Sequence, residues 1–492
     1  MSSAQLAEVS PLNSERRRTS TVLTSRSAGR IVAILPRGEA IRNFVQTGAL
    51  GLVREQADLT VISVAPDAQT LDDLSNSCDR LLELHQAPEP YPVRLLRELL
   101  DLVHGRTLWS AAAQERWRLR DAEAKTLPAR IKRVGKKLLA TPLAGVRGVS
   151  LVERWERRIS RLLSPSDHYI DLYRKIQPSL VFNGSHVHSV VAIQAVQAAQ
   201  WLGIPTATFI FSWDNLTSQG RILPPYDYYL VWNDDLKSQL LRLYPSIQEN
   251  KVIVTGTPQF DFHFDSATYW SREEFCQRVN ADPTRPIVLY STGMAEHMPG
   301  EPSIVERIAD ILTENESLRP QLLVRVYPKD ETGRFEELRR RRPDILFPEA
   351  RWISSWLTPT RADNQLLTNT LRHVDVGINV ASTVSLELCM FDKPVINVAY
   401  DPPGLPAVRV PYARYYEFDH YKPVVASGGV QVAFSEDELR AQLKEALEKP
   451  QMRASQRKAL MRSMFASTLD GRSHVRVADV LLKLATKMGG VQ

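Results

Sequence analysis

Residues 374–401 hold the side chains of this sequence that are best arranged to bind a phosphorylated ligand. An apolar run over 374–380 predicts a strand, and a segment of helical character follows it. Three hydroxyl side chains open that segment: Ser382, Thr383 and Ser385. The N–H groups at a helix start favour a phosphate, and Glu387 could accept hydrogen bonds from ribose hydroxyls. Alternatively, the hydroxyls only cap the helix and Glu387 is solvated.

Polar residues also follow predicted strands in the first half of the chain. Strand 31–35 is followed by four candidates for acceptor binding or catalysis: Arg37, Gly38, Glu39 and Asn43. Glycine permits close approach of a ligand, and Glu39 could face a cleft or be only a first-turn carboxylate. Strand 180–182 precedes His186 and His188. Both could bind a sugar or phosphate and His188 could act as a base, or both could cap the next helix.

The strand at 206–211 ends in a cluster that is typical of sugar binding: Trp213, Asp214 and Asn215. The aromatic ring can stack on the apolar face of a sugar while the amide and the carboxylate bond its hydroxyls. Asp214 is the carboxylate best placed to deprotonate an acceptor hydroxyl. The alternative is that Asp214 caps the segment after the strand.

The second half of the chain contains further candidates for holding a phosphate. Strand 286–290 ends in three residues that could offer hydroxyls and N–H groups: Ser291, Thr292 and Gly293. Arg325 lies on a predicted strand, and a buried arginine usually pairs with an anion. Lys329 follows that strand, and a later loop could bring His420 to a pyrophosphate.

Several motifs are absent. No Asp-x-Asp pair follows a strand, and there is no glycine-rich dinucleotide or P-loop fingerprint and no Gly-x-Ser-x-Gly elbow. The three cysteines, Cys78, Cys276 and Cys389, form no metal or redox pattern. We therefore expect neither a metal nor a cofactor.

The composition is that of a soluble globular protein with more than one domain. The 492 residues are 43% hydrophobic and 24% charged, with a net charge of +6. A mild positive charge fits a small anionic substrate or a membrane surface better than a nucleic acid. No run approaches the length of a membrane span, and residues 1–29 lack the apolar core of a signal peptide. These features predict a cytoplasmic protein with a disordered N-terminal tail.

Strand and helix patterns alternate twice along the chain, which predicts an α/β protein with two doubly wound, Rossmann-like domains facing a cleft. We place the first domain at 30–265 and the second at 284–470, followed by a C-terminal helix at 471–492. Residues 257–286 are expected to form a linker. Residues 69–163 are expected to be a helical insertion.

Basic and apolar residues alternate over 130–161 within that insertion. Such a pattern favours a solvated helical face, and the alternative is docking on an anionic membrane surface, which would make the protein peripheral to the membrane.

With both halves laid out, the chain resembles the GT-B superfamily of nucleotide-sugar glycosyltransferases. The branch it is most similar to is the bacterial surface-polysaccharide type, related to CDP-glycerol glycerophosphotransferases and UDP-N-acetylglucosamine 2-epimerases. The resemblance covers residues 30–480 apart from 69–163. It is carried by five stretches: 34–44, 212–217, 254–261, 325–330, and 382–387 with 393–398. Related transferases often have His-Pro where this chain has Tyr327-Pro328.

The resemblance implies that the second domain holds a nucleotide-sugar, with Glu387 on the ribose and the hydroxyls at 382–385 on the diphosphate. The first domain would hold a glycan or lipid-linked acceptor. The predicted reaction is metal-independent glycosyl transfer in surface polysaccharide biosynthesis, with Asp214 or Glu39 as base. The alternatives are a nucleotide-sugar epimerase or polyol-phosphate transferase, and a non-catalytic nucleotide-sugar-binding scaffold of an assembly complex.

Overall fold

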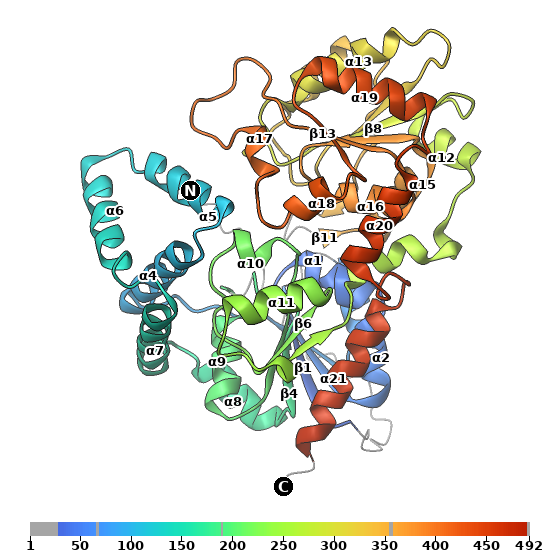
Figure 1. Ribbon diagram of the computed structural model, residues 1–492. Helices are drawn as coiled ribbons and strands as arrows, with labels where there is room; N and C mark the ends of the chain where they lie inside the picture. Colours follow the sequence, from blue (N-terminus) through green and yellow to red (C-terminus); the bar gives the residue numbers. More distant parts are fainter. Residues whose placement is uncertain (1–27, 65–67, 188–189, 354–357, 490–492) are drawn as a thin grey trace.

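The structure is a computed structural model that describes residues 28–64, 68–187, 190–353 and 358–489. It contains two parallel β-sheets, drawn one above the other in Figure 1. The N-terminal half of the chain builds the lower sheet, and the segment after residue 286 builds the upper one. The predicted α/β class with two Rossmann-like domains is confirmed.

The first sheet has the strand order β3-β2-β1-β4-β5-β6-β7. Its strands are β1 (Arg30–Leu35), β2 (Asp58–Ser63), β3 (Arg80–Glu83), β4 (Leu180–Asn183), β5 (Thr206–Phe209), β6 (Tyr228–Val231) and β7 (Val252–Val254). Central strands of a parallel sheet are covered on both faces, so they read as continuous apolar runs. Residues 31–35 are accordingly fully buried.

Short helices connect these strands. They are α1 (Gly38–Ile41), the π-helical η1 (Arg42–Gln46), α2 (Ala49–Gln56), α3 (Ala68–Ser77), α8 (Asp167–Ile176), α9 (Ile193–Trp201), α10 (Asn215–Ser218), α11 (Asp234–Leu243) and η2 (Glu249–Lys251).

The second sheet has the order β14-β13-β12-β8-β9. Its strands are β8 (Ile287–Ser291), β9 (Gln321–Arg325), β12 (Val376–Asn379), β13 (Val395–Val398) and β14 (Gln431–Ala433). A two-stranded ribbon, β10 (Trp352–Ile353) with β11 (Thr358–Pro359), lies outside it. The helices of this half are α13 (Glu301–Thr313), α14 (Glu336–Arg341), α15 (Arg361–His373), α16 (Val384–Met390), α17 (Tyr412–Tyr415), α18 (Lys422–Ala426), α19 (Glu436–Glu448) and α20 (Ala454–Phe465).

Both sheets reverse their winding direction at one point. In the first sheet the chain moves from β1 to β2 on one side and to β4 on the other, and in the second sheet it does the same from β8 to β9 and β12. Ligands of such sheets bind outside the carboxyl ends of the strands at these switch points. The segments that follow β1, β8 and β12, including the starts of α1 and α16, contain many of the residues that the sequence singles out.

The last helix returns to the first domain. The helix α21 (Ser473–Gly489) runs down beside α2, as Figure 1 shows, and also contacts β4. Val477, Leu481 and Ala485 are spaced along one side of α21 and are buried. The helix α21 therefore forms part of the first domain, although it follows the second domain in the sequence.

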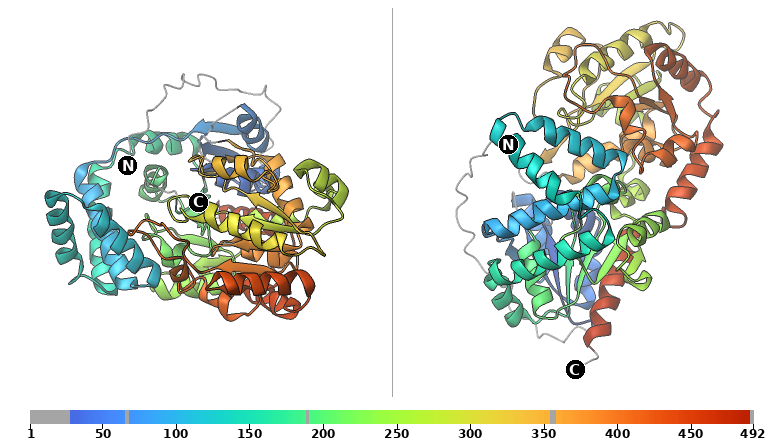
Figure 2. Two further views of the ribbon diagram at one scale, coloured as in Figure 1. Left: turned by 90° about the horizontal axis from the view of Figure 1, so that it is seen from above. Right: turned by 60° about the vertical axis from the view of Figure 1, so that its left-hand side comes forward.

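Residues 69–163 are not helical throughout. Arg80–Glu83 forms β3, the edge strand of the first sheet, where it pairs with β2. The helical part is a lobe of four helices, α4 (Tyr91–Leu108), α5 (Ala111–Glu123), α6 (Leu127–Ala140) and α7 (Val146–Leu163). The right-hand view of Figure 2 brings this lobe forward at the flank of the molecule.

The predicted linker at 257–286 is also a folded segment. It contains η3 (Pro258–Phe264), η4 (Ser266–Thr268) and α12 (Arg272–Val279). Phe260, Phe275 and Cys276 are buried in the main hydrophobic core. The prolines that suggested a linker stand at the first turn of η3 and before β8, positions that tolerate proline. Across the described part of the chain, no helix has both the length and the apolar character needed to cross a membrane.

Candidate functional site

The carboxyl ends of the two sheets face each other. Glu39, which follows β1, forms an ion pair with Lys329, which follows β9. Trp213, in the loop after β5, donates its indole N–H to the hydroxyl of Thr383, 3.2 Å away, in the loop after β12. The predicted acceptor and donor residues therefore meet across the interface between the domains.

A row of polar residues crosses the second sheet at this edge. The parallel register aligns Asn397, Asn379, Ser291 and Arg325 on β13, β12, β8 and β9. The Asn379 Oδ1 atom accepts hydrogen bonds from Ser385 Oγ and Asn397 Nδ2, each 3.0 Å long. The hydroxyl of Tyr421 lies 2.9 Å from Ser385 Oγ and 2.7 Å from Asn397 Oδ1, within hydrogen-bond distance of both. The Ser385 hydroxyl is thus held in a buried network that supports the floor of the site, and it does not face the opposite domain.

Backbone N–H groups at the start of α16 form hydrogen bonds within the protein. The N–H of Ser382 donates to Asn379, that of Val384 to the Ser382 hydroxyl and that of Ser385 to the Ser382 carbonyl. The expectation of unpaired N–H groups at this helix start is therefore wrong for these three residues. The half-buried side chains of Ser382 and Thr383 are the groups that remain for a ligand.

Glu387 has a partner that the sequence did not reveal. Its Oε1 atom lies 3.0 Å from His263 Nε2, and His263 Nδ1 lies 3.0 Å from the hydroxyl of Thr368. His263 belongs to η3 and is buried against Phe260 and Phe391. Because Glu387 is itself buried rather than solvated, the two side chains fix each other's orientation. The available sequence signal was that His263 is one of two polar residues, with Asp261, in the otherwise aromatic run 260–264.

Arg325 is buried and holds an acid of its own domain. Its Nη2 atom donates to Asp363 Oδ2 at 2.7 Å, and Trp352 Nε1 donates to the same oxygen at 2.6 Å. The Arg325 Nη1 atom is buried with no hydrogen-bond partner in the described residues. Since an unpartnered buried guanidinium N–H is costly, this atom is a candidate to meet an anion.

The loop Ser291–Gly293 is organised by Glu301 of α13. Both carboxylate oxygens of Glu301 accept from the Gly293 N–H at 2.9 Å, and Arg334 lies 2.9 Å from one of them. The Thr292 hydroxyl accepts from the N–H of Tyr327, and the Thr292 N–H donates to the Arg325 carbonyl. The backbone N–H groups of Thr292 and Gly293, which were expected to bind a phosphate, therefore form hydrogen bonds within the protein instead.

Burial raises the pKa of Glu301 from 4.5 to about 7, although Arg334 and the Gly293 N–H oppose this shift. The folded state then binds the proton more tightly than the unfolded state. The free energy of unfolding should consequently fall as pH rises from about 4.5 to 7, by up to about 3 kcal/mol. Urea unfolding of the wild type and of Glu301→Gln across this range should show a difference in stability that depends on pH. Parallel pH profiles for wild type and Glu301→Gln would contradict this assignment.

The loop after β1 is packed tightly against the second domain. Glu39 is buried and its second oxygen lies 3.8 Å from Arg37, which is half-buried. Asn43 is fully buried and accepts from Arg42 Nε. Arg42 also donates to Gln259, and its pKa is lowered by burial against the opposing effect of Glu39 and Glu387. Arg42, absent from the predicted site residues, therefore lies close enough to both carboxylates to be influenced by their charge.

Gly38 allows this close packing. A Cβ on Gly38 would lie 2.2 Å from Thr358 Oγ1 and 2.5 Å from its backbone Cα. Gly38→Ala should therefore destabilise the protein by about 1–3 kcal/mol through overpacking. Gly51→Ala in α2 is the matched control, because its Cβ would meet nothing within 4 Å. Chemical denaturation should separate the two variants, and equal stabilities would show that the contact carries no strain.

Asp214 lies beside an aromatic group contributed by both domains. The ring of Trp213 contacts His420 edge to face at 5.2 Å and Tyr421 at 5.7 Å. Asp214 accepts from Ser218 at 2.7 Å and from the Asn215 amide at 3.3 Å, which orients the carboxylate. Burial lowers the pKa of His420, against the opposing charges of Asp214 and Asp419. The ring of His420 thus lies against Trp213 and close enough to Asp214 for the charge of that carboxylate to act on it.

His186 has a local structural contact. Its Nδ1 atom lies 3.2 Å from the Phe209 carbonyl and 3.4 Å from the Phe211 N–H, so the buried ring connects the ends of β4 and β5. His188 lies outside the described residues. No group of three or more metal-ligating side chains occurs in the described ranges.

No protein-family model matches this chain, and a search of curated proteins finds no significant match. Solved structures do match. A UDP-N-acetylglucosamine 2-epimerase aligns at 14% identity and a TM-score of 0.51, over 93% of this chain and 96% of its own. A Listeria monocytogenes protein assigned to the same epimerase class aligns at 13% identity and a TM-score of 0.52, over 91% and 94%.

The S. aureus protein MnaA in complex with UDP aligns at 12% identity and a TM-score of 0.51, covering 91% of this chain and 94% of that one. At these identities the likeness concerns the fold. It agrees with the two sheets and their facing carboxyl ends, and the fold that the resemblance implied is confirmed.

Proposed function

We propose that this protein, which has the GT-B fold, is a glycosyltransferase. It would move a sugar from a nucleotide-sugar to a hydroxyl of a glycan or lipid-linked acceptor in surface polysaccharide biosynthesis. One observation carries the proposal. Trp213, which directly precedes Asp214 in one domain, contacts Thr383 and His420 of the other. A group suited to hold a sugar and accept a proton thus adjoins the residues suited to hold a diphosphate.

The donor would be bound by the second domain. Glu387, oriented by His263, would accept from the ribose hydroxyls. Ser382 and Thr383 would bond the diphosphate through their hydroxyls. Lys329 and the unpartnered Arg325 Nη1 supply positive charge on the same side of the interface. Fixed cations that meet the leaving diphosphate would lower the barrier as its charge develops.

Asp214 is the better candidate for the base. Its carboxylate is half-buried and, within the described residues, accepts hydrogen bonds only from a neutral hydroxyl and a neutral amide. Glu39, the other candidate, is held by Lys329 in this arrangement. A carboxylate in a close ion pair accepts a proton less readily, so Glu39 would instead keep Lys329 in position.

An epimerase acting on a nucleotide-sugar is the second candidate, because the solved structures with this fold include UDP-N-acetylglucosamine 2-epimerases. An epimerase needs no second substrate. The lobe α4–α7 adjoins α10, directly after Asp214, through a bond from Ser110 Oγ to the Thr217 carbonyl. An additional element beside the first-domain half of the site favours a separate acceptor.

The first experiment is a thermal-shift screen of the protein with UDP-, GDP-, CDP- and CMP-linked sugars. A ligand at a hundredfold excess over its Kd adds about 2.7 kcal/mol to the stability of the native state. The positive nucleotide-sugar is then incubated with the protein alone and with membrane lipid extract. Release of the nucleotide only with extract supports transfer, whereas conversion of the sugar without an acceptor identifies an epimerase. Binding without either reaction would favour the scaffold.

A further inference from the structure

The helix α6 presents an apolar stripe to solvent. Four residues at helical spacing form it and are strongly exposed: Leu127 (70%), Ile131 (64%), Val134 (55%) and Leu138 (70%). An amphipathic helix on a globular protein normally turns such a stripe towards the core. The stripe of α6 is turned away from it.

Three of the five basic residues of α6 form ion pairs with the rest of the lobe. Arg133 and Lys137 pair with Asp121 of α5, and Lys136 pairs with Glu98 of α4. These inward ion pairs fix the rotation of α6 about its axis. The exposure of the apolar stripe is therefore a consequence of specific contacts.

The outer face of α7 combines apolar and basic residues. Its inner face, with Val149, Val152 and Glu156, is buried towards the lobe. Leu151, Trp155 and Leu162 are exposed by 42%, 51% and 77% on the other face. Arginines lie on the same side of the helix or beside it: Arg147, Arg154, Arg158 and Arg161.

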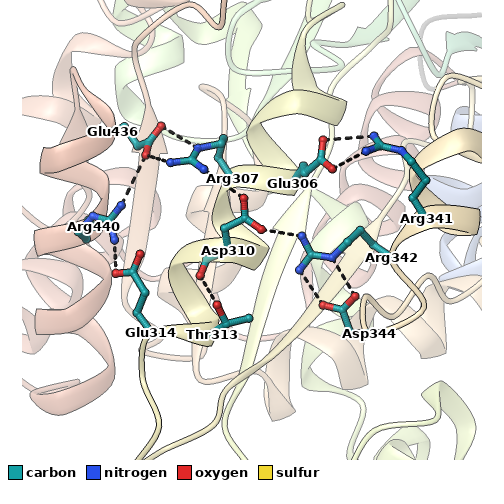
Figure 3. A network of polar contacts seen from close by, with 10 residues as sticks. All are labelled: Glu306, Arg307, Asp310, Thr313, Glu314, Arg341, Arg342, Asp344, Glu436 and Arg440. Carbon is teal, nitrogen blue, oxygen red and sulfur yellow. Dashed lines mark hydrogen bonds and ion pairs between the residues drawn. The ribbon is translucent and has the colours of Figure 1, made fainter.

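None of those four arginines forms an ion pair within the described residues. The contrast with the second domain is clear in Figure 3, where Arg307, Arg342 and Arg440 are each bound to carboxylates. Residues 127–163 contain ten Lys and Arg against two Glu. Their positive charge exceeds that of the entire chain, +6.

We propose that the outer faces of α6 and α7 dock on the surface of an anionic lipid bilayer. Exposed Leu, Ile and Trp side chains would enter the boundary between headgroups and acyl chains, and unpaired arginines would meet the lipid phosphates. The pairing of an apolar stripe with free positive charge selects this occupant, because a purely apolar partner would leave the arginines desolvated and uncompensated.

Docking would place the site near the membrane. The lobe is joined to α10 by the Ser110–Thr217 bond and to the second domain by Arg414 with Glu115, at 3.3 Å. Asp214 directly precedes α10. The acceptor would then be a lipid-linked glycan, a step that rests on the proposed transferase function, whereas the docking itself does not.

The test is co-sedimentation of the full chain with vesicles of pure phosphatidylcholine and with vesicles of equal parts phosphatidylcholine and phosphatidylglycerol. We expect binding only to the anionic vesicles, falling as salt is raised. Ile131→Ser with Leu138→Ser should abolish binding, and Arg154→Gln with Arg158→Gln should weaken it by about fivefold for each arginine removed. Both variants keep the sequence of residues 1–27 unchanged, so a loss of binding would be assigned to α6 and α7.

Matched controls lie elsewhere on the surface. Phe434→Ser removes an apolar side chain that is 57% exposed in the second domain, and Arg340→Gln with Arg462→Gln removes two exposed helical arginines. These controls should bind like the wild type. Equal binding by the α6 and α7 variants would overturn the proposal. A change of oligomeric state in the α6 variant in the absence of lipid would also overturn the proposal, because the stripe would then be a protein interface. Nucleotide-induced thermal shifts test the proposed function separately.

Discussion

Replacing Asp214 with Asn should reduce the turnover of sugar transfer by about 100- to 10,000-fold, the range in which a positioned general base contributes. Asn keeps the size of the side chain and can still accept from Ser218, so the loop after β5 should remain intact. What is lost is the ability to take the proton of the acceptor hydroxyl. Binding of the nucleotide-sugar, measured by thermal shift, should be unchanged.

The control for Asp214→Asn is Asp419→Asn. The charge of Asp419, like that of Asp214, opposes the lowering of the His420 pKa. Unlike Asp214, Asp419 forms an ion pair with Lys422. Removing this charge should leave turnover nearly intact. If Asp419→Asn were as damaging as Asp214→Asn, the effect would be electrostatic, through His420. If His420→Gln alone abolished turnover and Asp214→Asn did not, the imidazole would be the base.

The fold was predictable because its signals are local. The apolar runs 31–35 and 287–290 are buried strands, and polar residues at their ends mark the edge where ligands bind in parallel sheets. The edge strand β3 was missed because only two of its four residues are apolar and all are partly or fully exposed. A strand at the edge of a sheet is less buried than a central strand, so its sequence is less strongly apolar.

The site was predictable only in part, because its contacts are distant in the sequence. The row Asn397, Asn379, Ser291 and Arg325 exists only once four strands are in register. Similarly, the sequence shows Ser385 as a hydroxyl at a helix start, but not that Asn379 and Tyr421 bond it. Residue type and local pattern identified the edge of the sheet. They could not separate groups that meet a ligand from groups that hold the site together.

Contacts between the domains show what a ligand would have to rearrange. Besides the Glu39–Lys329 and Trp213–Thr383 pairs, Gln46 donates to the Pro359 carbonyl and accepts from Asn364. The facing strand ends are therefore held together by side chains in this arrangement. A nucleotide-sugar that entered between them would replace the Trp213–Thr383 bond, which joins the sugar-stacking candidate to the diphosphate-binding candidate. Donor and acceptor binding are then expected to be coupled.

Replacing Glu387 with Ala should weaken nucleotide-sugar binding by about 10- to 100-fold, because hydrogen bonds to a charged group contribute about 1.5–3 kcal/mol. The substitution should also lower the stability of the free protein, since His263 Nε2 loses its partner in a buried position. Isothermal titration with the nucleotide-sugar found in the screen measures the first effect. Thermal unfolding without ligand measures the second.

Comparison with His263→Phe separates a ligand contact from a structural one. Both variants remove the same 3.0 Å contact, but His263→Phe leaves the Glu387 carboxylate in place and keeps an aromatic ring against Phe260 and Phe391. If Glu387 bonds the ribose, the two variants should be similarly destabilised while only Glu387→Ala loses most of its affinity. Equal losses of affinity would mean that the pair merely shapes the domain interface. The ribose would then have to be held elsewhere, and the assignment of the second domain as the donor domain would lose its main support.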